Sequence, residues 1–182
     1  KRSVALKAQK KKPPAWPNDI YAVFKEVGIK QVAYVPDAGH TQLINTCHAD
    51  KSMKVISLTT EEEGVAMLAG AWLGGERGVL LMQSSGVGNC INILSIMHEC
   101  RFPLLMIVTM RGEWGEFNPW QLAMGQGTPP ALQHAGVVVQ RVDHAHEIRE
   151  HAFAAAQLTF NSCRPVALLI SQRVIGFKDW SK

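Results

Sequence analysis

The sequence contains few cysteines, and they are widely separated. Four occur in 182 residues, at Cys47, Cys90, Cys100 and Cys163, and no two of them form a C-x-x-C pair. This spacing argues against a disulfide framework and against a zinc site built on paired cysteines. We therefore expect a protein of a reducing compartment, the cytoplasm, with no metal ion held by its own side chains.

Long hydrophobic runs are also missing. The longest, residues 103–108 and 166–170, are far shorter than the roughly 20 residues of a membrane-spanning helix, so no membrane is expected. The G-x-x-x-x-G-K-[ST] and G-x-G-x-x-G phosphate loops are absent, as is the G-x-S-x-G elbow. These absences argue against a nucleotide-phosphate loop and against a serine hydrolase.

Positive charge is concentrated at the N-terminus. Six of the 19 Lys and Arg residues lie within the first twelve positions, so residues 13–182 contain 13 basic and 15 acidic residues, and the net charge of +4 comes from the tail. Pro13 and Pro14 end this run. We expect residues 1–15 to form a basic, disordered tail and residues 16–182 to form one domain, with no nucleic-acid partner.

Six apolar runs have the length and composition of β-strands. They are residues 31–35, 54–58, 78–83, 104–109, 137–142 and 165–170. The spacers allow about six helices, the first expected at 18–28, between Pro17 and Gly28. Several runs are apolar on both alternations, which is typical of strands covered by helices on both faces. The pattern predicts an α/β fold with a doubly wound, six-stranded parallel sheet.

Polar residues follow four successive strands of this predicted sheet. Asp37 and His40 follow the first strand, the glutamates 61–63 the second, the segment 83–89 the third and Arg111 the fourth. Ligands of open α/β sheets bind at the carboxyl ends of strands. We therefore expect these groups to form a ring around a binding site.

Each of these groups has a structural and a functional interpretation. Acids at 61–63 stabilise a helix start capped by Thr60, or one of them is a buried, proton-handling carboxylate beside a helix rich in Gly and Ala. The segment 83–89 is a turn, or its free N–H groups bind a ligand. Arg111 is a surface residue, or it binds a carboxylate, sulfonate or phosphonate. Residues 110–130, rich in Gly and Pro, predict a long loop of the kind that is often functional.

Four segments together resemble a known family. They are Val35-Pro36-Asp37, Thr60–Gly64 with Ala69–Leu73, Met82–Asn89, and Arg111-Gly112-Glu113. The match extends from Trp16 onward and is similar to the pyrimidine-binding domain of thiamine-diphosphate-dependent 2-oxoacid decarboxylases, in particular the sulfopyruvate and phosphonopyruvate decarboxylases. The resemblance implies the same doubly wound fold.

By this resemblance, one glutamate would hydrogen-bond N1′ of the cofactor's aminopyrimidine and promote its imino tautomer, and the cofactor would take up electrons as carbon dioxide leaves. Counting back from Ala69 and Gly70 against the phosphonopyruvate-type pattern selects Glu61. Aligning Ala66 and Ala69 with acetohydroxyacid-type enzymes selects Glu62. We take Glu61 as the first choice and keep Glu62 as the second.

The resemblance also implies the surroundings of the reacting centre. The cofactor would contact Pro36, Asp37, Glu61, Gln83, Gly86 and Asn89. The substrate would be bordered by Asp37, His40, Ser84, Ser85 and Arg111, with Arg111 near its anionic tail. Ser84 stands where the family often has asparagine.

A partner chain is implied as well. The Gly-Asp-Gly motif with which such enzymes hold Mg²⁺ at the diphosphate does not occur in the sequence. The resemblance therefore implies a separate β subunit that carries the diphosphate-binding domain and the Mg²⁺. Thiamine diphosphate would bind between the chains of an α2β2 or larger assembly.

The leading hypothesis is the α subunit of a carboxy-lyase that converts 3-sulfopyruvate, a small anionic 2-oxoacid, to sulfoacetaldehyde and carbon dioxide. Phosphonopyruvate decarboxylase, or a subunit of another 2-oxoacid lyase, is the enzymatic alternative, because Arg111 suits any of these anions. A non-catalytic regulatory or binding subunit with the same fold is the alternative from another class.

Overall fold

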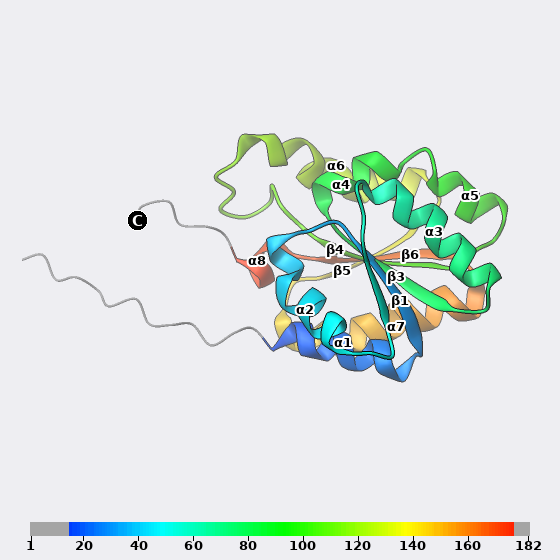
Figure 1. Cartoon of the computed structure of the whole chain (residues 1–182). Coiled ribbons are helices and arrows are strands. Elements are labelled where there is room, and N and C mark those ends of the chain that lie inside the picture. The colour runs from blue at the N-terminus through cyan, green and yellow to red at the C-terminus, as the bar shows by residue number, and fades with distance from the viewer. Residues whose placement is uncertain (1–14, 177–182) are drawn as a thin grey trace, which may run out of the picture.

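The structure, a computed structural model, describes residues 15–176, which form one β-sheet with helices on both of its faces (Figure 1). The predicted basic tail, residues 1–15, lies outside this part of the chain except for Ala15 and stays a prediction. The strands are β1 (Ile29–Tyr34), β2 (Lys54–Ser57), β3 (Arg77–Gln83), β4 (Leu104–Thr109), β5 (Val138–Val142) and β6 (Pro165–Ile170). Each overlaps one of the six predicted runs, with ends that differ by at most two residues.

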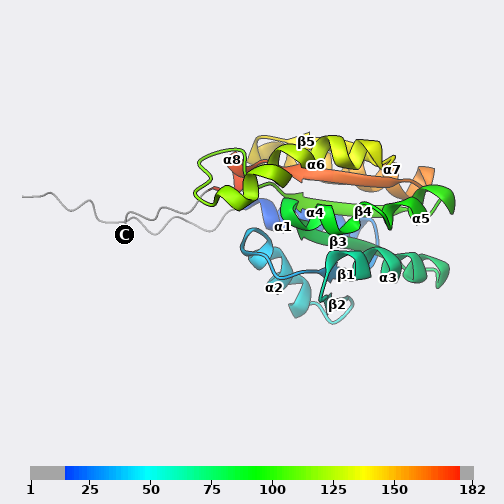
Figure 2. The same cartoon turned by 90° about the horizontal axis from the view of Figure 1, so that it is seen from above.

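All strand pairs are parallel, and the order across the sheet is β2-β1-β3-β4-β6-β5 (Figure 2). The predicted doubly wound, six-stranded sheet is confirmed. The chain moves outward in one direction from β1 to β2 and in the other from β3 to β4, so the order reverses between β1 and β3. Open α/β sheets bind ligands at such a switch point, outside the carboxyl ends of the strands.

Helices cover both faces of the sheet (Figure 1). On one face lie α1 (Trp16–Glu26), α2 (Thr41–Ala49) and α7 (Ile148–Ser162), and on the other α3 (Glu61–Leu73), α4 (Ser84–Cys90), α5 (Leu94–Glu99) and α6 (Leu122–His134). The described residues contain eight α-helices rather than about six, because the spacer after β3 holds two helices and the short α8 (Gln172–Ile175) follows β6. Within residues 15–176, no helix is long and apolar enough to cross a membrane.

The first helix differs slightly from its predicted position. It occupies residues 16–26 rather than 18–28. Gly28 follows with a φ of +72°, a left-handed conformation that glycine adopts without steric cost. Gly28 therefore lies just beyond the end of the helix, whereas the prediction made it the last helical residue.

The two-sided apolar strands divide the core into two layers. Val79 and Leu81 of β3 pack against the α1, α2 and α7 layer. Leu80 and Met82 of the same strand pack against the α3–α6 layer. Because successive side chains of a strand point to opposite faces, a strand buried on both faces must be apolar throughout.

The expectation of a long loop at residues 110–130 is wrong for its second half, where α6 begins at Leu122 and continues through two glycines and two prolines. Tertiary contacts explain the helix. A Cβ at Gly125 would lie 2.2 Å from the carbonyl oxygen of Arg111, so α6 packs directly on the backbone that follows β4. The buried Thr128 donates a hydrogen bond from Oγ1 to the carbonyl oxygen of Ser84 at 3.2 Å. These contacts override a composition that disfavours helices.

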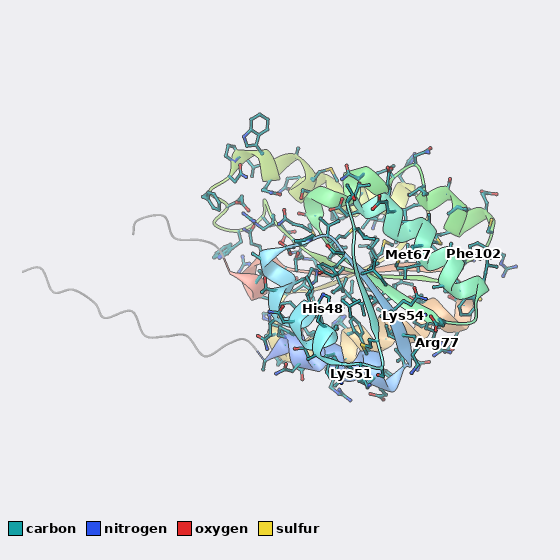
Figure 3. The ribbon with its side chains drawn as sticks, viewed as in Figure 1. His48, Lys51, Lys54, Met67, Arg77 and Phe102 are labelled. Carbon is teal, nitrogen blue, oxygen red and sulfur yellow. The ribbon has the colours of Figure 1, made fainter. Side chains whose placement is uncertain are left out.

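The β2 edge of the sheet is short and charged. Lys54 at its start forms an ion pair with Glu76 at 3.7 Å, and His48 and Lys51 lie close to the same edge (Figure 3). Positive side chains on an edge strand oppose pairing with a strand of another molecule. The groups that suit ligand binding lie instead at the carboxyl ends of the strands.

Candidate functional site

Three strand ends are tied together by a hydrogen-bonded network around Asp37. Asp37 follows β1, and its Oδ1 accepts a hydrogen bond from Nε2 of Gln83, the last residue of β3, at 2.8 Å. Its Oδ2 accepts one from Oγ1 of Thr109, the last residue of β4, at 2.6 Å. Gln83 in turn accepts a hydrogen bond from Ser85 at 2.8 Å. The predicted neighbours Asp37, Gln83 and Ser85 therefore lie together at the switch point.

Thr109 was not predicted from the sequence. The sequence did contain a pattern that could have indicated it, because Thr109 is a polar residue at the end of an otherwise apolar strand. It is almost fully buried, and the carboxylate of Asp37 is its closest partner. With its carboxylate held by Gln83 and Thr109, Asp37 has a fixed orientation.

Glu61, the first residue of α3, is buried, with 7% of its surface exposed. Its Oε2 accepts a hydrogen bond from Nδ2 of Asn89 in α4 at 2.8 Å. A Cβ at Gly86 would lie 2.1 Å from Oε1 of Glu61, so the carboxyl group rests against the bare backbone of α4. The structure thus brings Glu61, Gly86 and Asn89 into one cluster.

The two neighbouring glutamates have different surroundings. Glu62 is exposed. Glu63 turns back to the start of its own helix, where its Oε2 accepts hydrogen bonds from the backbone N–H of Thr59 at 2.8 Å and of Thr60 at 3.5 Å. The helix-capping interpretation therefore describes Glu63, and the buried-carboxylate interpretation describes Glu61.

His40 lies beneath the site rather than in it. Its side chain is fully buried, and Nε2 is 3.3 Å from the carbonyl oxygen of Met82 and 3.2 Å from that of Ile107. Burial lowers the pKa of His40 below its usual value. In this position a neutral imidazole joins β3 to β4 and supports the turn that carries Asp37.

Ser84 is also buried and engaged. Its Oγ accepts a hydrogen bond from the backbone N–H of Arg111 at 3.0 Å, so it joins the end of β3 to the end of β4. Pro36 is exposed beside the Asp37 turn.

Arg111 has a partner that the sequence did not reveal. Its Nε and Nη2 donate to the two carboxylate oxygens of Glu116 at 2.7 and 2.6 Å. The side chain of Glu116 is 2% exposed and that of Arg111 is 19% exposed. Burial raises the pKa of Glu116, but the hydrogen bonds from Arg111, from backbone N–H groups and from Gln172 lower it more, to about 2.

A pocket of about 180 Å³ lies between the Asp37 network and Arg111. Its walls are formed by Asp37, Ala38, Gly39, Thr109, Arg111, Ile175 and Gly176. It combines a carboxylate, a hydroxyl group and a guanidinium group with apolar walls. Such a pocket suits a small polar molecule with an anionic group.

The cluster of Glu61, Gly86 and Asn89 fits the aminopyrimidine end of thiamine diphosphate. The Glu61 carboxylate, held at Oε2 by the amide of Asn89, offers Oε1 to a ring nitrogen, and the missing side chain at Gly86 leaves room for the carboxyl group. Residues 15–176 contain no group of three His, Cys, Asp or Glu side chains arranged to hold a metal ion.

An open parallel sheet with a buried carboxylate beside its switch point defines the class, an α/β cofactor-binding domain. The family model for the thiamine pyrophosphate enzyme, N-terminal TPP binding domain, matches residues 18–127. The chain belongs to this thiamine pyrophosphate enzyme family. The resemblance predicted from the sequence is confirmed at this level.

Individual relatives agree with this assignment. Sulfopyruvate decarboxylase subunit alpha of Methanococcus maripaludis is 34% identical over 83% of this chain and 91% of that protein. Phosphonopyruvate decarboxylase of Streptomyces viridochromogenes is 34% identical over 87% of this chain but only 41% of that protein. Among solved structures, 2-oxoglutarate:ferredoxin oxidoreductase from Magnetococcus marinus superposes with a TM-score of 0.67 at 12% identity, over 88% of this chain and 29% of that one, which shows a shared fold.

Proposed function

We propose that this chain is the α subunit of a thiamine-diphosphate-dependent decarboxylase that converts 3-sulfopyruvate to sulfoacetaldehyde and carbon dioxide. The observation that carries the proposal is the buried carboxylate of Glu61, which rests against Gly86 and is held by Asn89. The similarity to sulfopyruvate decarboxylase α subunits over nearly their whole length supports this substrate. Phosphonopyruvate is the alternative substrate, supported by relatives of that name.

Glu61 would act on the aminopyrimidine ring. Oε2 is held by Asn89, and Oε1 accepts no hydrogen bond from the described residues, so Oε1 would face the ring nitrogen N1′. A proton shared between the carboxyl group and N1′ would activate the cofactor. Bound thiamine diphosphate would supply the carbon nucleophile and the electron sink for decarboxylation. Glu62, which is exposed, lacks the surroundings for this role.

The network around Asp37 would organise the substrate side. Gln83 and Thr109 fix both carboxylate oxygens of Asp37 at the pocket wall. Asp37 would then border the reacting centre in a fixed orientation, and Arg111, on the same wall, would bind the second anionic group of the substrate. His40 and Ser84 would act indirectly, by holding the strand ends in place.

The proposal includes a second subunit. Relatives of almost the same length are called subunit alpha, whereas the sulfopyruvate decarboxylase of Methanosarcina acetivorans is longer, and this chain covers 40% of it. We propose a β subunit that holds the diphosphate and Mg²⁺, in an α2β2 or larger assembly. The four free cysteines support a reducing, cytoplasmic location.

The test is to combine the purified chain with the β subunit, thiamine diphosphate, Mg²⁺ and 3-sulfopyruvate, and to measure carbon dioxide and sulfoacetaldehyde. Both products are expected from the mixture, and neither from either chain alone. Faster turnover of 3-phosphonopyruvate would assign the alternative substrate. A mixture that binds the cofactor but releases no carbon dioxide from any 2-oxoacid would support the non-catalytic subunit instead.

A further inference from the structure

The segment that follows β4 is held in place by a buried glutamine. Gln172, at the start of α8, is fully buried, and its Oε1 accepts hydrogen bonds from the backbone N–H of Glu113 and of Trp114, both at 3.0 Å. Its Nε2 donates to Oε2 of Glu116 at 2.9 Å. The end of β6 and the segment after β4 are therefore locked together, although they are far apart in the chain.

Glu116 is the centre of this arrangement. Besides Arg111 and Gln172, its carboxylate accepts hydrogen bonds from the backbone N–H of Gly112 at 3.2 Å and of Asn118 at 3.0 Å. Both oxygens are thus saturated by donors from four other residues. A carboxylate held in this way has one orientation, and its bidentate pair gives Arg111 one orientation too.

The orientation of Arg111 matters because of the donors that remain. Glu116 engages one N–H of Nε and one of Nη2, so three N–H groups are left on the guanidinium, two on Nη1 and one on Nη2. Arg111 forms part of the pocket wall with Asp37 and Thr109. The ion pair is neutral as a whole. Recognition of an anion at this wall therefore depends on where the free N–H groups point more than on net charge.

We propose that Glu116 is a positioning residue that sets the selectivity of the site for 2-oxoacids with a second anionic group. By holding Nε and Nη2 of Arg111, it directs the free edge of the guanidinium toward the anionic tail of the substrate. This inference rests on the proposed function. A purely structural ion pair would stabilise the segment without discriminating between substrates, and this difference separates the two roles.

The experiment compares Glu116→Gln with Glu113→Gln in the assembled complex of both subunits. Glu113 is a matched control, because it lies in the same segment and also pairs with an arginine, Arg141, but does not touch Arg111. Two constants are measured: the KM for 3-sulfopyruvate, and the inhibition constant of pyruvate, which lacks the second anionic group. Thermal unfolding of each variant checks that it is folded.

Glu116→Gln is expected to raise the KM for 3-sulfopyruvate about 10- to 100-fold, the range expected for hydrogen bonds to a charged group, with little change in kcat or in the inhibition constant of pyruvate. Glu113→Gln is expected to leave all three close to wild type. An equal loss for both ligands, no change, or a lower KM in Glu116→Gln would each overturn the inference.

A second readout separates this inference from the proposed function. Sulfoacetate, an unreactive molecule with a carboxylate and a sulfonate, is titrated into the wild-type and variant complexes, and acetate serves as the comparison ligand. If Glu116→Gln binds sulfoacetate more weakly than wild type but binds acetate equally well, the positioning role is supported even if the wild-type complex shows no turnover. Inactivity of the wild-type complex would count against the proposed function, whereas unchanged binding of sulfoacetate would count against the role of Glu116.

Discussion

Glu61, Glu62 and Glu63 are adjacent in the chain but occupy three different environments. Glu61 faces α4 and is buried, Glu62 faces solvent, and Glu63 accepts hydrogen bonds from the N–H groups that precede its own helix. The α-helix causes this separation, since successive residues point about 100° apart around its axis. The sequence placed an acid at this strand end, but which acid is buried depends on the packing of α3 against α4.

Gly86→Ala tests the contact between these helices. The added Cβ would lie 2.1 Å from Oε1 of Glu61, so the carboxyl group must move. We expect the free energy of unfolding to fall by about 1–3 kcal/mol, the usual cost of overpacking, and decarboxylation to fall with it. Chemical denaturation and carbon dioxide release measure the two effects.

Gly88→Ala is the control for that variant. It lies in the same helix, and its new Cβ would have Sδ of Met124, at 3.5 Å, as its nearest neighbour, an ordinary contact. Stability and activity close to wild type are expected. If Gly86→Ala behaves like Gly88→Ala, the close packing of Glu61 on α4 is not required.

Thr109 and Glu116 are two residues of the site that the sequence did not predict. Both are defined by contacts with residues distant in the chain or across a turn, Asp37 for Thr109 and Arg111 with Gln172 for Glu116. The sequence indicated that polar groups would gather at the strand ends, because parallel strands end on one side of the sheet. It did not indicate which of them would pair, since that depends on the conformation of the connecting segments.

At the scale of elements, strands were predicted better than helices. The central strands β3, β4 and β6 are buried on both faces, so their apolar runs begin and end nearly where the strands do. Helix α6 was expected to be a loop because of Gly125, Gly127, Pro129 and Pro130. Its contacts with the backbone of Arg111 and with Ser84 stabilise it in spite of this composition, and such contacts leave no local pattern.

The start of α3 offers a test of the capping role. Glu63→Ala removes the acceptor for the N–H groups of Thr59 and Thr60, and we expect it to lower the free energy of unfolding by about 1 kcal/mol. Glu62→Ala removes the same charge from the same turn without removing a cap, so a smaller loss is expected. Thermal or urea unfolding distinguishes them, and equal losses would mean that charge alone, and not the cap, stabilises this helix start.

At the scale of the whole molecule, the sheet order explains the position of the site. The order reverses between β1 and β3, and Asp37, Glu61 and Gln83 lie at the carboxyl ends beside this point. The alternation of strands and helices predicted this architecture from the sequence. In our proposal, the second subunit faces this site and supplies the surface that binds the diphosphate and Mg²⁺.

Stability of the folded chain should depend on pH through Glu116. Hydrogen bonds outweigh the effect of burial and lower its pKa from an ordinary value of 4.5 to about 2. The folded state therefore gains stability above about pH 4.5, on the order of 3 kcal/mol, and loses it as the pH falls toward 2. Glu116→Gln should remove this part of the pH dependence, whereas Glu113→Gln should keep it. Urea unfolding between pH 2 and pH 6 measures the slopes, and identical slopes for wild type and Glu116→Gln would show that Glu116 is not the group responsible.

Carbon dioxide release by the assembled complex, compared among wild type, Glu61→Gln and Glu62→Gln, tests the assignment of the activating carboxylate. Glutamine keeps the size of the side chain and the contact with Asn89 but cannot share a carboxyl proton. We expect Glu61→Gln to lower kcat by about 10²- to 10⁴-fold, the usual contribution of a positioned acid or base, and Glu62→Gln to stay close to wild type. Loss of activity in Glu62→Gln with retention in Glu61→Gln, or full activity in both, would contradict the assignment.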